Sequence, residues 1–269
     1  MTVEMAEHDD WRMHQERFGD ALIGLLEIGS FARGEAVSLS DHDMRLVVDI
    51  ADPLLVLDEL RWSDDGQDIT LLDWRILQGA SGYSYGFSNL AYIEASIEQG
   101  RFPLNDHTAI YQGAIRLDLD KRIAAFRAKY IGRRFDNLFG DFARQIDWRV
   151  NHRMTKELSA LFQRLDRDKC SVPATQTGYR AMRDMAHLDS YRRTGLYCAS
   201  AEEVDDYFSG QPKPIRDAFR RLWELKVIES ERSQLFADLE AGNEARGREI
   251  DGLATQVAEA WRLFQKAVR

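Results

Sequence analysis

The sequence predicts an α/β domain, a mixed sheet with flanking helices, followed by an α-helical bundle domain. In the first half of the chain, short apolar runs that end in glycine or proline alternate with helical patterns, which is typical of a mixed α/β layer. From about residue 118 onward, apolar side chains recur at helical spacing over long stretches. We therefore expect the α/β domain at 1–117 and the helical domain at 118–269.

Apolar runs define the expected strands of the first domain. Leu22 to Ile28 is closed by Gly29, and Met44 to Ile50 is rich in valine. Further strands are expected at Ile69 to Trp74 and Thr108 to Tyr111, and helices at 10–22 and 53–62. The glycine- and aromatic-rich segment QGASGYSYGFS, 78–88, predicts a loop, either beside a ligand or on the mobile surface.

The second half carries stripes of apolar residues that predict four or five helices. Breaks in the pattern are expected at 171–177 and at Pro212 and Pro214. The stripes comprise Ile123, Phe126 and Tyr130; Phe142, Ile146, Val150, Met154, Leu158, Leu161 and Leu165; the stretch from Tyr179 to Tyr197; and Ile250, Leu253, Val257, Trp261 and Phe264.

Composition limits the class of protein. With 44% hydrophobic and 30% charged residues, the chain of 269 residues is expected to fold into a globular core. Cys170 and Cys198 lack metal-type spacing, and no apolar run approaches the ~18 residues of a membrane span, so we expect a cytoplasmic protein without a membrane partner. A net charge of -9 favours a cationic or small substrate. Nothing in the sequence decides whether the chain forms a homo-oligomer.

Two aspartates at the start of the second strand suggest a metal site. Asp41 and Asp43 are two residues apart, so in a strand both side chains project from the same face. Adjacent carboxylates repel each other unless a cation neutralises them. Mg²⁺ prefers hard oxygen ligands and is commonly held by one or two carboxylates together with substrate phosphates. The pair is therefore a candidate Mg²⁺ clamp.

The end of the first strand suggests a phosphate site. Gly29 lets the backbone approach a phosphate closely, and the hydroxyl of Ser30 can donate a hydrogen bond to a phosphate oxygen. A helix that begins near Ser30 would add free backbone N–H groups. Arg33 follows one turn later, within reach of the same triphosphate. The alternative is a capped helix followed by a turn.

Gly-Ser and Asp-x-Asp are each common, but their combination between two apolar strands is specific. Ten residues separate Ser30 from Asp41 in the segment GSFARGEAVSLSDHDMRLVV, 29–48. This segment resembles the signature of the polymerase-β-like nucleotidyltransferase superfamily, and in particular the aminoglycoside nucleotidyltransferases and the minimal nucleotidyltransferases of toxin–antitoxin systems. His42 departs from the pattern, since the family usually has an apolar residue there.

The resemblance implies a third carboxylate on a later strand. Asp68, in the segment QDITLL, stands in the acidic place of that strand, and Asp73 is its rival. The two would lie on opposite faces of a strand, so only one of them can be the third carboxylate of the site. On the resemblance we favour Asp68. If Asp68 does not bind metal, it is a candidate base for the acceptor hydroxyl.

The same resemblance implies transfer of a nucleoside monophosphate from an NTP, with ATP the first expectation, to a hydroxyl of an acceptor. The first expectation for the acceptor is a small cationic molecule of the aminoglycoside kind, as in antibiotic resistance, since the chain is acidic. The alternatives are a toxin-type enzyme that modifies tRNA or a partner protein, and a degenerate nucleotide-binding or partner-binding module. Arg180, Asp184, His187 and Tyr191 share one helix face, which either lines the acceptor pocket or is a polar outer face.

Overall fold

The computed structural model describes residues 15–16, 18–34, 36, 42–51, 61–64, 67–70, 83–153, 173–198 and 200–268. The chain divides into two compact units, which are described separately. The first, called the sheet unit, comprises Met1–Ala32 and Asp41–Phe135, and the second, called the helical unit, comprises Arg33–Ser40 and Asp136–Arg269. The domain ranges 1–117 and 118–269 stay a prediction.

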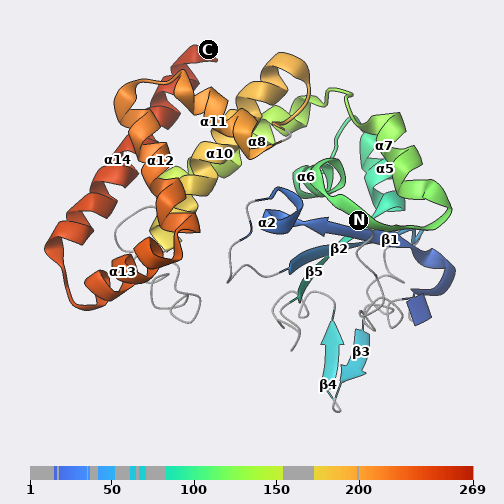
Figure 1. Ribbon diagram of the computed structural model, residues 1–269. Helices are drawn as coiled ribbons and strands as arrows, with labels where there is room; N and C mark the ends of the chain where they lie inside the picture. Colours follow the sequence, from blue (N-terminus) through green and yellow to red (C-terminus); the bar gives the residue numbers. More distant parts are fainter. Residues whose placement is uncertain are drawn as a thin grey trace. The chain divides into compact units, whose positions relative to one another are not determined.

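A four-stranded sheet with the order β5-β2-β1-β6 forms the sheet unit (Figure 1). The central strand β1 (Leu22–Ile28) is antiparallel to both β2 (His42–Val48) and β6 (Ala114–Asp118), whereas β5 (Tyr83–Asn89) runs parallel to β2. A separate antiparallel pair consists of β3 (Arg61–Asp64) and β4 (Gln67–Thr70). The mixed sheet confirms the predicted fold class of this half of the chain.

Three helices cover one face of this sheet, as Figure 1 shows: α5 (Leu90–Glu98), α6 (Leu104–Gln112) and α7 (Arg122–Tyr130). The 3₁₀ turns η2 (Gly19–Ala21) and η3 (Leu119–Lys121) precede β1 and α7. The other face carries an apolar cluster in which β2 contributes alternate residues, as period-2 geometry requires. Its buried members are Phe18, Leu22, Met44, Leu46, Val48 and Ile50.

Strand β1 matches its predicted bounds, and β2 begins and ends two residues before them. Two other predictions are wrong. Residues 83–88 form most of β5 rather than a loop, and residues 108–111 lie in helix α6 rather than in a strand. A short apolar run is compatible with either a strand or a helix. Here the helix begins directly after Pro103, which has no backbone N–H group to donate to a preceding helix or strand.

The helices predicted at 10–22 and 53–62 extend too far. Leu22 already begins β1, and Trp62 lies in β3, because each pairs with a neighbouring strand. Within the predicted strand 69–74, the first two residues close β4, while 71–74 lie outside the described residues, as do 10–14 and 53–60.

The helical unit is built around α10 (Pro173–Thr194), which packs against five other described helical elements of the unit (Figure 1). These are α8 (Asp136–Trp148), the π-helical turn η4 (Arg149–Arg153), α11 (Ala201–Ser209), α12 (Lys213–Val227) and α14 (Glu244–Ala267). Helix α13 (Glu229–Glu240) packs on α12 and α14. None of the helices that the structure describes has the length and hydropathy needed to cross a membrane.

The apolar residues of the predicted helical stripes are buried where the structure describes them, except Leu196 in the stretch 179–197, which is 39% exposed. The closing stripe, from Ile250 to Phe264, faces the core of the helical unit, and so do Phe142 and Ile146 of α8. The break predicted at 171–177 is too long, because α10 already begins at Pro173, a residue favoured in a first helical turn. Residues 154–172, with the rest of the second stripe, lie outside the described residues.

His107 is a buried titratable group in the sheet unit. It is 2% exposed, and its ring lies 4.6 Å from the ring of Phe102, edge to face. Burial lowers the pKa of His107 from 6.5 to about 4, because the charged form loses its hydration. Between these two values the unfolded chain binds more protons than the folded one, so the free energy of unfolding falls as the pH falls.

We therefore expect the stability of the protein to decline from about pH 6.5 toward pH 4, by about 3 kcal/mol from this residue alone. Replacement by leucine, His107→Leu, removes the titration, so the difference in unfolding free energy between variant and wild type should change over that range. Urea titrations at pH 7.5, 5.5 and 4.5 measure it. Parallel pH profiles of the two proteins would show that His107 is not the origin of the decline.

Candidate functional site

The end of β1 and the start of β2 meet at a corner that brings two predicted site residues together. In the antiparallel register Ile28 is opposite Asp43, so Gly29 follows directly beside the Asp43 side chain. A Cβ atom built on Gly29 would lie 2.9 Å from both Cβ and Cγ of Asp43, and closer still to Oδ2. Gly29 also has a φ of +72°, which favours glycine. The carboxylate therefore occupies space that only a glycine leaves.

Ser30 follows Gly29 in α2 (Gly29–Ala32), a single turn that begins where β1 ends and packs against β2. A short helical segment therefore starts at the Gly-Ser pair. Arg33 is half-buried in the turn after α2. Asp41, the other predicted metal ligand, lies outside the described residues, so its assignment stays a prediction.

The sheet face that carries Asp43 also carries Arg45, because the β2–β5 ladder continues without a bulge from His42 to Val48. Arg45 is 7% exposed, and it crosses the neighbouring strand at Gly86. A Cβ on Gly86 would lie 2.7 Å from Nη1 of Arg45 and 3.3 Å from its Cδ. A glycine is needed in β5 because a buried cation, two residues from Asp43, passes over it.

Helix α6 provides the acceptors for this arginine. Nη2 of Arg45 donates to the carbonyl oxygen of Asn105 at 3.4 Å and lies 3.9 Å from Oδ1 of Asp106. The same Asp106 oxygen accepts a hydrogen bond of 2.6 Å from Ser88 of β5. This network fixes β2, β5 and α6 to one another beside the corner. A buried ionic network of this kind holds geometry more than it adds stability.

The sequence interpretation missed Arg45, although the rule that groups Asp41 with Asp43 also places Arg45 on their face. No local signal identifies its partners, since Asn105 is 60 positions away along the chain. Glu27, a buried carboxylate of β1, was also missed. It is 5% exposed and pairs with Arg116 of β6, and its register partner is Met44, so it belongs to the opposite face from Asp43.

The backbone of Asp68 lies in β4, opposite Ser63 of β3. Strand β4 belongs to the two-stranded sheet, whereas the strand parallel to β2 is β5, whose sequence YSYGFSN contains no carboxylate. The side chain of Asp68 and the whole of Asp73 lie outside the described residues, so the third carboxylate stays a prediction.

The corner fits part of a magnesium site. The carboxylate of Asp43 is a hard oxygen donor of the kind that Mg²⁺ prefers, and the missing Cβ of Gly29 leaves space in which that oxygen meets the start of α2. Among the residues that the structure describes, no group of three or more His, Cys, Asp or Glu side chains is placed to hold a metal ion. The remaining predicted ligands, Asp41 and Asp68, have no described side chain, so the fit rests on Asp43 alone.

In the helical unit, the polar face predicted on α10 is mostly buried. Asp184 is 4% exposed and forms ion pairs with Arg149 of η4 and, at 3.1 Å, with Arg183. His187 and Tyr191 are buried as well, whereas Arg180 is exposed. The interpretation of this face as a polar, solvent-exposed surface is therefore wrong for three of the four residues. The ion pair of Asp184 with Arg149 instead links α10 to η4.

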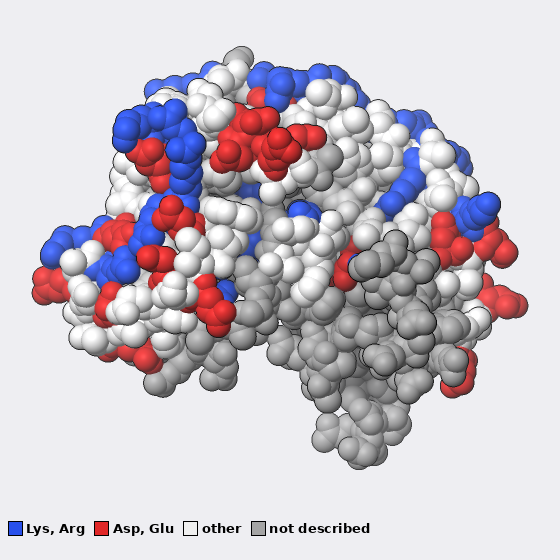
Figure 2. Space-filling view, in the orientation of Figure 1, with Lys and Arg blue, Asp and Glu red and all other residues white. Residues whose placement is uncertain are grey.

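The paired arginines of α10 are partly neutralised within their own helix. Arg192 and Arg193 both bind Asp189, at 3.1 and 2.8 Å. On the face of the molecule in Figure 2, positive and negative side chains are interspersed over the helical unit. This pattern differs from the basic stripe that is typical of a nucleic-acid interface.

Comparison with known proteins by sequence finds no matching family model and no matching curated protein. Among solved structures, the chain is similar to spectinomycin adenyltransferase AAD(9) from Enterococcus faecialis, determined with ATP and spectinomycin. The TM-score is 0.46 and the identity 11%, over 92% of this chain and 96% of that chain. At this score and identity the likeness decides nothing about activity, which we infer instead from the residues of the β1–α2–β2 corner.

Proposed function

We propose that this protein is a metal-dependent nucleotidyltransferase whose catalytic centre is the β1–α2–β2 corner. The observation that carries the proposal is the contact of Gly29 with the Asp43 carboxylate at the point where β1 ends and α2 begins. A phosphate-binding turn and a metal-binding carboxylate must lie side by side for phosphoryl chemistry, because the metal neutralises the phosphates that the turn holds.

In the reaction, a hydroxyl oxygen of the acceptor forms a bond to the α-phosphorus of the NTP. The bond from that phosphorus to the bridging oxygen breaks, pyrophosphate leaves, and the hydroxyl proton passes to a base, for which Asp68 is the candidate if it does not bind metal. Ser30 donates a hydrogen bond to a phosphate oxygen, and Arg33 pairs with the triphosphate. Mg²⁺, held by Asp43 and Asp41 with Asp68 as a third ligand or Asp73 in its place, supplies charge neutralisation when bound.

Positioning is the main contribution of the protein to such a reaction. The Asp43 carboxylate is confined between Gly29 and the sheet, and the Arg45–Asp106–Ser88 network fixes the strand on which it sits.

We propose a small cationic molecule of the aminoglycoside kind as the acceptor. The net charge of -9 attracts a polycation, and Arg192 and Arg193 are held by Asp189 rather than presented as a pair of unbalanced charges. A tRNA or protein acceptor is the second candidate, and it would require basic side chains that converge on the metal centre.

A screen of the four α-labelled NTPs tests the proposal. Each is incubated with the full chain, with and without Mg²⁺, and with a panel of aminoglycosides or with total tRNA. We expect label to move from one NTP, with ATP the first expectation, to an aminoglycoside only when Mg²⁺ is present. Label on tRNA would identify tRNA as the acceptor in place of an aminoglycoside and would still support nucleotidyl transfer. Label on neither acceptor, with no release of pyrophosphate, would contradict the proposal that the protein is a nucleotidyltransferase.

The phosphate contacts have their own test. Ser30→Ala and Arg33→Ala should each weaken binding of a non-hydrolysable NTP about tenfold or more, because hydrogen bonds to charged groups contribute about 1.5–3 kcal/mol. Calorimetric titration in Mg²⁺ measures this, and Arg101→Ala is the charge-matched control for Arg33, because Arg101 is an exposed arginine between α5 and α6 of the sheet unit. Unchanged affinity in both site variants means that the turn does not hold the phosphates.

A further inference from the structure

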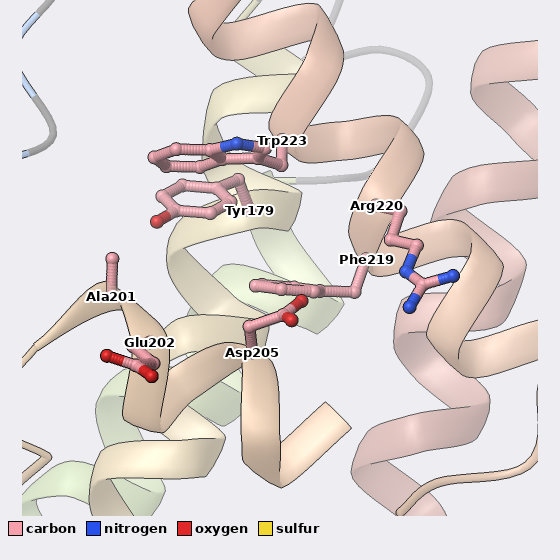
Figure 3. Close-up of a pocket in the computed structure, with 7 residues that line it drawn as sticks. All are labelled: Tyr179, Ala201, Glu202, Asp205, Phe219, Arg220 and Trp223. Atoms are coloured by element: carbon pink, nitrogen blue, oxygen red, sulfur yellow. The ribbon is translucent and has the colours of Figure 1, made fainter. Parts of the chain in front are cut away.

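The helical unit contains a cavity of about 220 Å³ between α10, α11 and α12 (Figure 3). Aromatic rings form one part of its wall and carboxylates another. The rings belong to Tyr179, Phe219 and Trp223, and the charged side chains to Glu202, Asp205 and Arg220. All of them lie in one unit, so the cavity does not depend on how the two units are placed.

The aromatic wall is a surface that attracts cations. The ring of Tyr179 lies 5.3 Å from that of Trp223 and 5.9 Å from that of Phe219, and Figure 3 shows the Tyr179 and Trp223 rings one above the other. The faces of such rings carry partial negative charge. They already hold one ammonium group in the fold, because Nζ of Lys226 lies 4.6 Å from the Tyr179 centroid and 5.3 Å from the Trp223 centroid.

The acidic part of the wall has charge that the described fold does not balance. Glu202 and Asp205 are three positions apart on α11, so they project from neighbouring points of one helix face. Both are exposed, and within the described part of the chain neither forms a hydrogen bond or an ion pair. In Figure 3 the side chain of Arg220 extends away from Tyr179 and Trp223, so its charge is separated from those two rings.

We propose that this cavity is a binding site for a small organic cation, an ammonium group carried on a compact hydrocarbon body. Trp223, the one half-buried ring of the three, takes the hydrocarbon and the face of the cation, while Tyr179 and Phe219, 1% and 5% exposed, support it from behind. Glu202 and Asp205 balance the charge of the cation. The volume of 220 Å³ is below the roughly 300–1,000 Å³ of pockets for drug-sized ligands, so the ligand is a small one. An anion would meet two carboxylates against the single guanidinium of Arg220, and a neutral molecule would leave the excess negative charge unbalanced.

A second cavity in the helical unit, of about 360 Å³, lacks this charge complementarity. Its acidic residue is Asp189, which is already paired with Arg192 and Arg193. The proposal therefore concerns the cavity of α10, α11 and α12 alone. It does not rest on the proposed transferase activity, since it involves neither the NTP nor the metal centre.

Titration of the full chain with choline tests the proposal, and 3,3-dimethylbutan-1-ol serves as the neutral molecule of nearly the same shape. Calorimetry is carried out at constant chloride, without NTP or Mg²⁺. We expect choline to bind at least tenfold more tightly than the alcohol. Equal affinity for the two, or no binding of choline, would overturn the proposal, and neither result bears on nucleotidyl transfer.

Substitutions locate the site. Trp223→Leu should weaken choline binding about five- to thirtyfold, the range that corresponds to a cation–π contact, while Trp223→Phe, which keeps a ring, should retain most of the affinity. Asp205→Asn and Glu202→Gln should each weaken binding severalfold. Asp206→Asn is the matched control, because it removes the same charge from the same helix at a position that does not line the cavity. Unchanged affinity in both Asp205→Asn and Trp223→Leu would place any choline binding elsewhere.

Discussion

Asp43→Asn is expected to abolish nucleotidyl transfer while the protein stays folded. The substitution keeps the shape of the side chain but removes the charge that would hold the metal ion beside Gly29. Loss of one electrostatic contact to a transition state costs on the order of 10²–10³-fold in rate, and loss of a metal ligand costs at least as much, so activity should fall to background. Initial rates of pyrophosphate release in Mg²⁺ measure the effect.

The melting temperature of the apo protein distinguishes this effect from misfolding. Because Asp41 and Asp43 repel each other without a cation, the Asp43→Asn protein should melt at the wild-type temperature or above it. Asp41→Asn should behave in the same way if both residues hold the metal. Asp20→Asn, an exposed aspartate in η2 of the same unit, is the control for the loss of charge and should keep full activity. Full turnover by Asp43→Asn would exclude the proposed site.

Gly29→Ala is expected to lower activity by about 10²-fold or more, through geometry rather than charge. The new Cβ would lie 2.9 Å from Cβ and Cγ of Asp43 and nearer to its Oδ2, so the carboxylate must move. A shift of about 1 Å in a catalytic group costs on the order of 10²-fold. The φ of +72° adds backbone strain of roughly 1–2 kcal/mol for an alanine.

The two effects of this substitution can be separated. Gly100 has a φ of +77°, and a Cβ added there would meet no atom within 4 Å, so Gly100→Ala carries the backbone strain without the collision. We expect both variants to lose similar stability in urea titrations and only Gly29→Ala to lose transfer. If Gly100→Ala loses as much activity as Gly29→Ala, the contact with Asp43 has no catalytic role.

The sequence predicted the parts of the fold whose information is local. Strand β1 matches its predicted bounds because an apolar run is closed by a glycine that must adopt a positive φ. The proximity of Gly29 and Asp43 was implicit in the spacing of the motif, since two strands joined by a connection of this length pair readily as antiparallel neighbours. The buried stripe of α14 follows directly from its helical period.

What could not be predicted depends on contacts between distant residues. The segment that became β5 is rich in glycine and aromatic residues, which suggested a loop, but Gly86 is there because Arg45 crosses it. That requirement comes from a residue 41 positions earlier in the chain, which no local pattern reports. Ser88 likewise acquires its role only when α6 brings Asp106 within 2.6 Å.

The position of the third carboxylate is the least predictable part of the site for the same reason. Asp68 was favoured from the family resemblance of its strand, and the structure pairs that strand with β3, while β5 lies beside β2. Pairing between strands is decided by the whole sheet and not by the strand alone. Asp68→Asn and Asp73→Asn, compared for transfer and for Mg²⁺-dependent NTP binding, would distinguish the two assignments.

In the proposed enzyme, the corner formed by Gly29 and Asp43 binds an NTP together with Mg²⁺. Calorimetric titration of a non-hydrolysable ATP analogue into wild-type, Asp43→Asn and Asp20→Asn proteins, with Mg²⁺ and with EDTA, tests this most directly. We expect wild type and Asp20→Asn to bind the analogue at least tenfold more tightly with Mg²⁺ than with EDTA, and Asp43→Asn to show no such difference. Binding that is equally tight in all three proteins and independent of Mg²⁺, or no binding to the wild type of this or any other NTP analogue, would contradict the proposal.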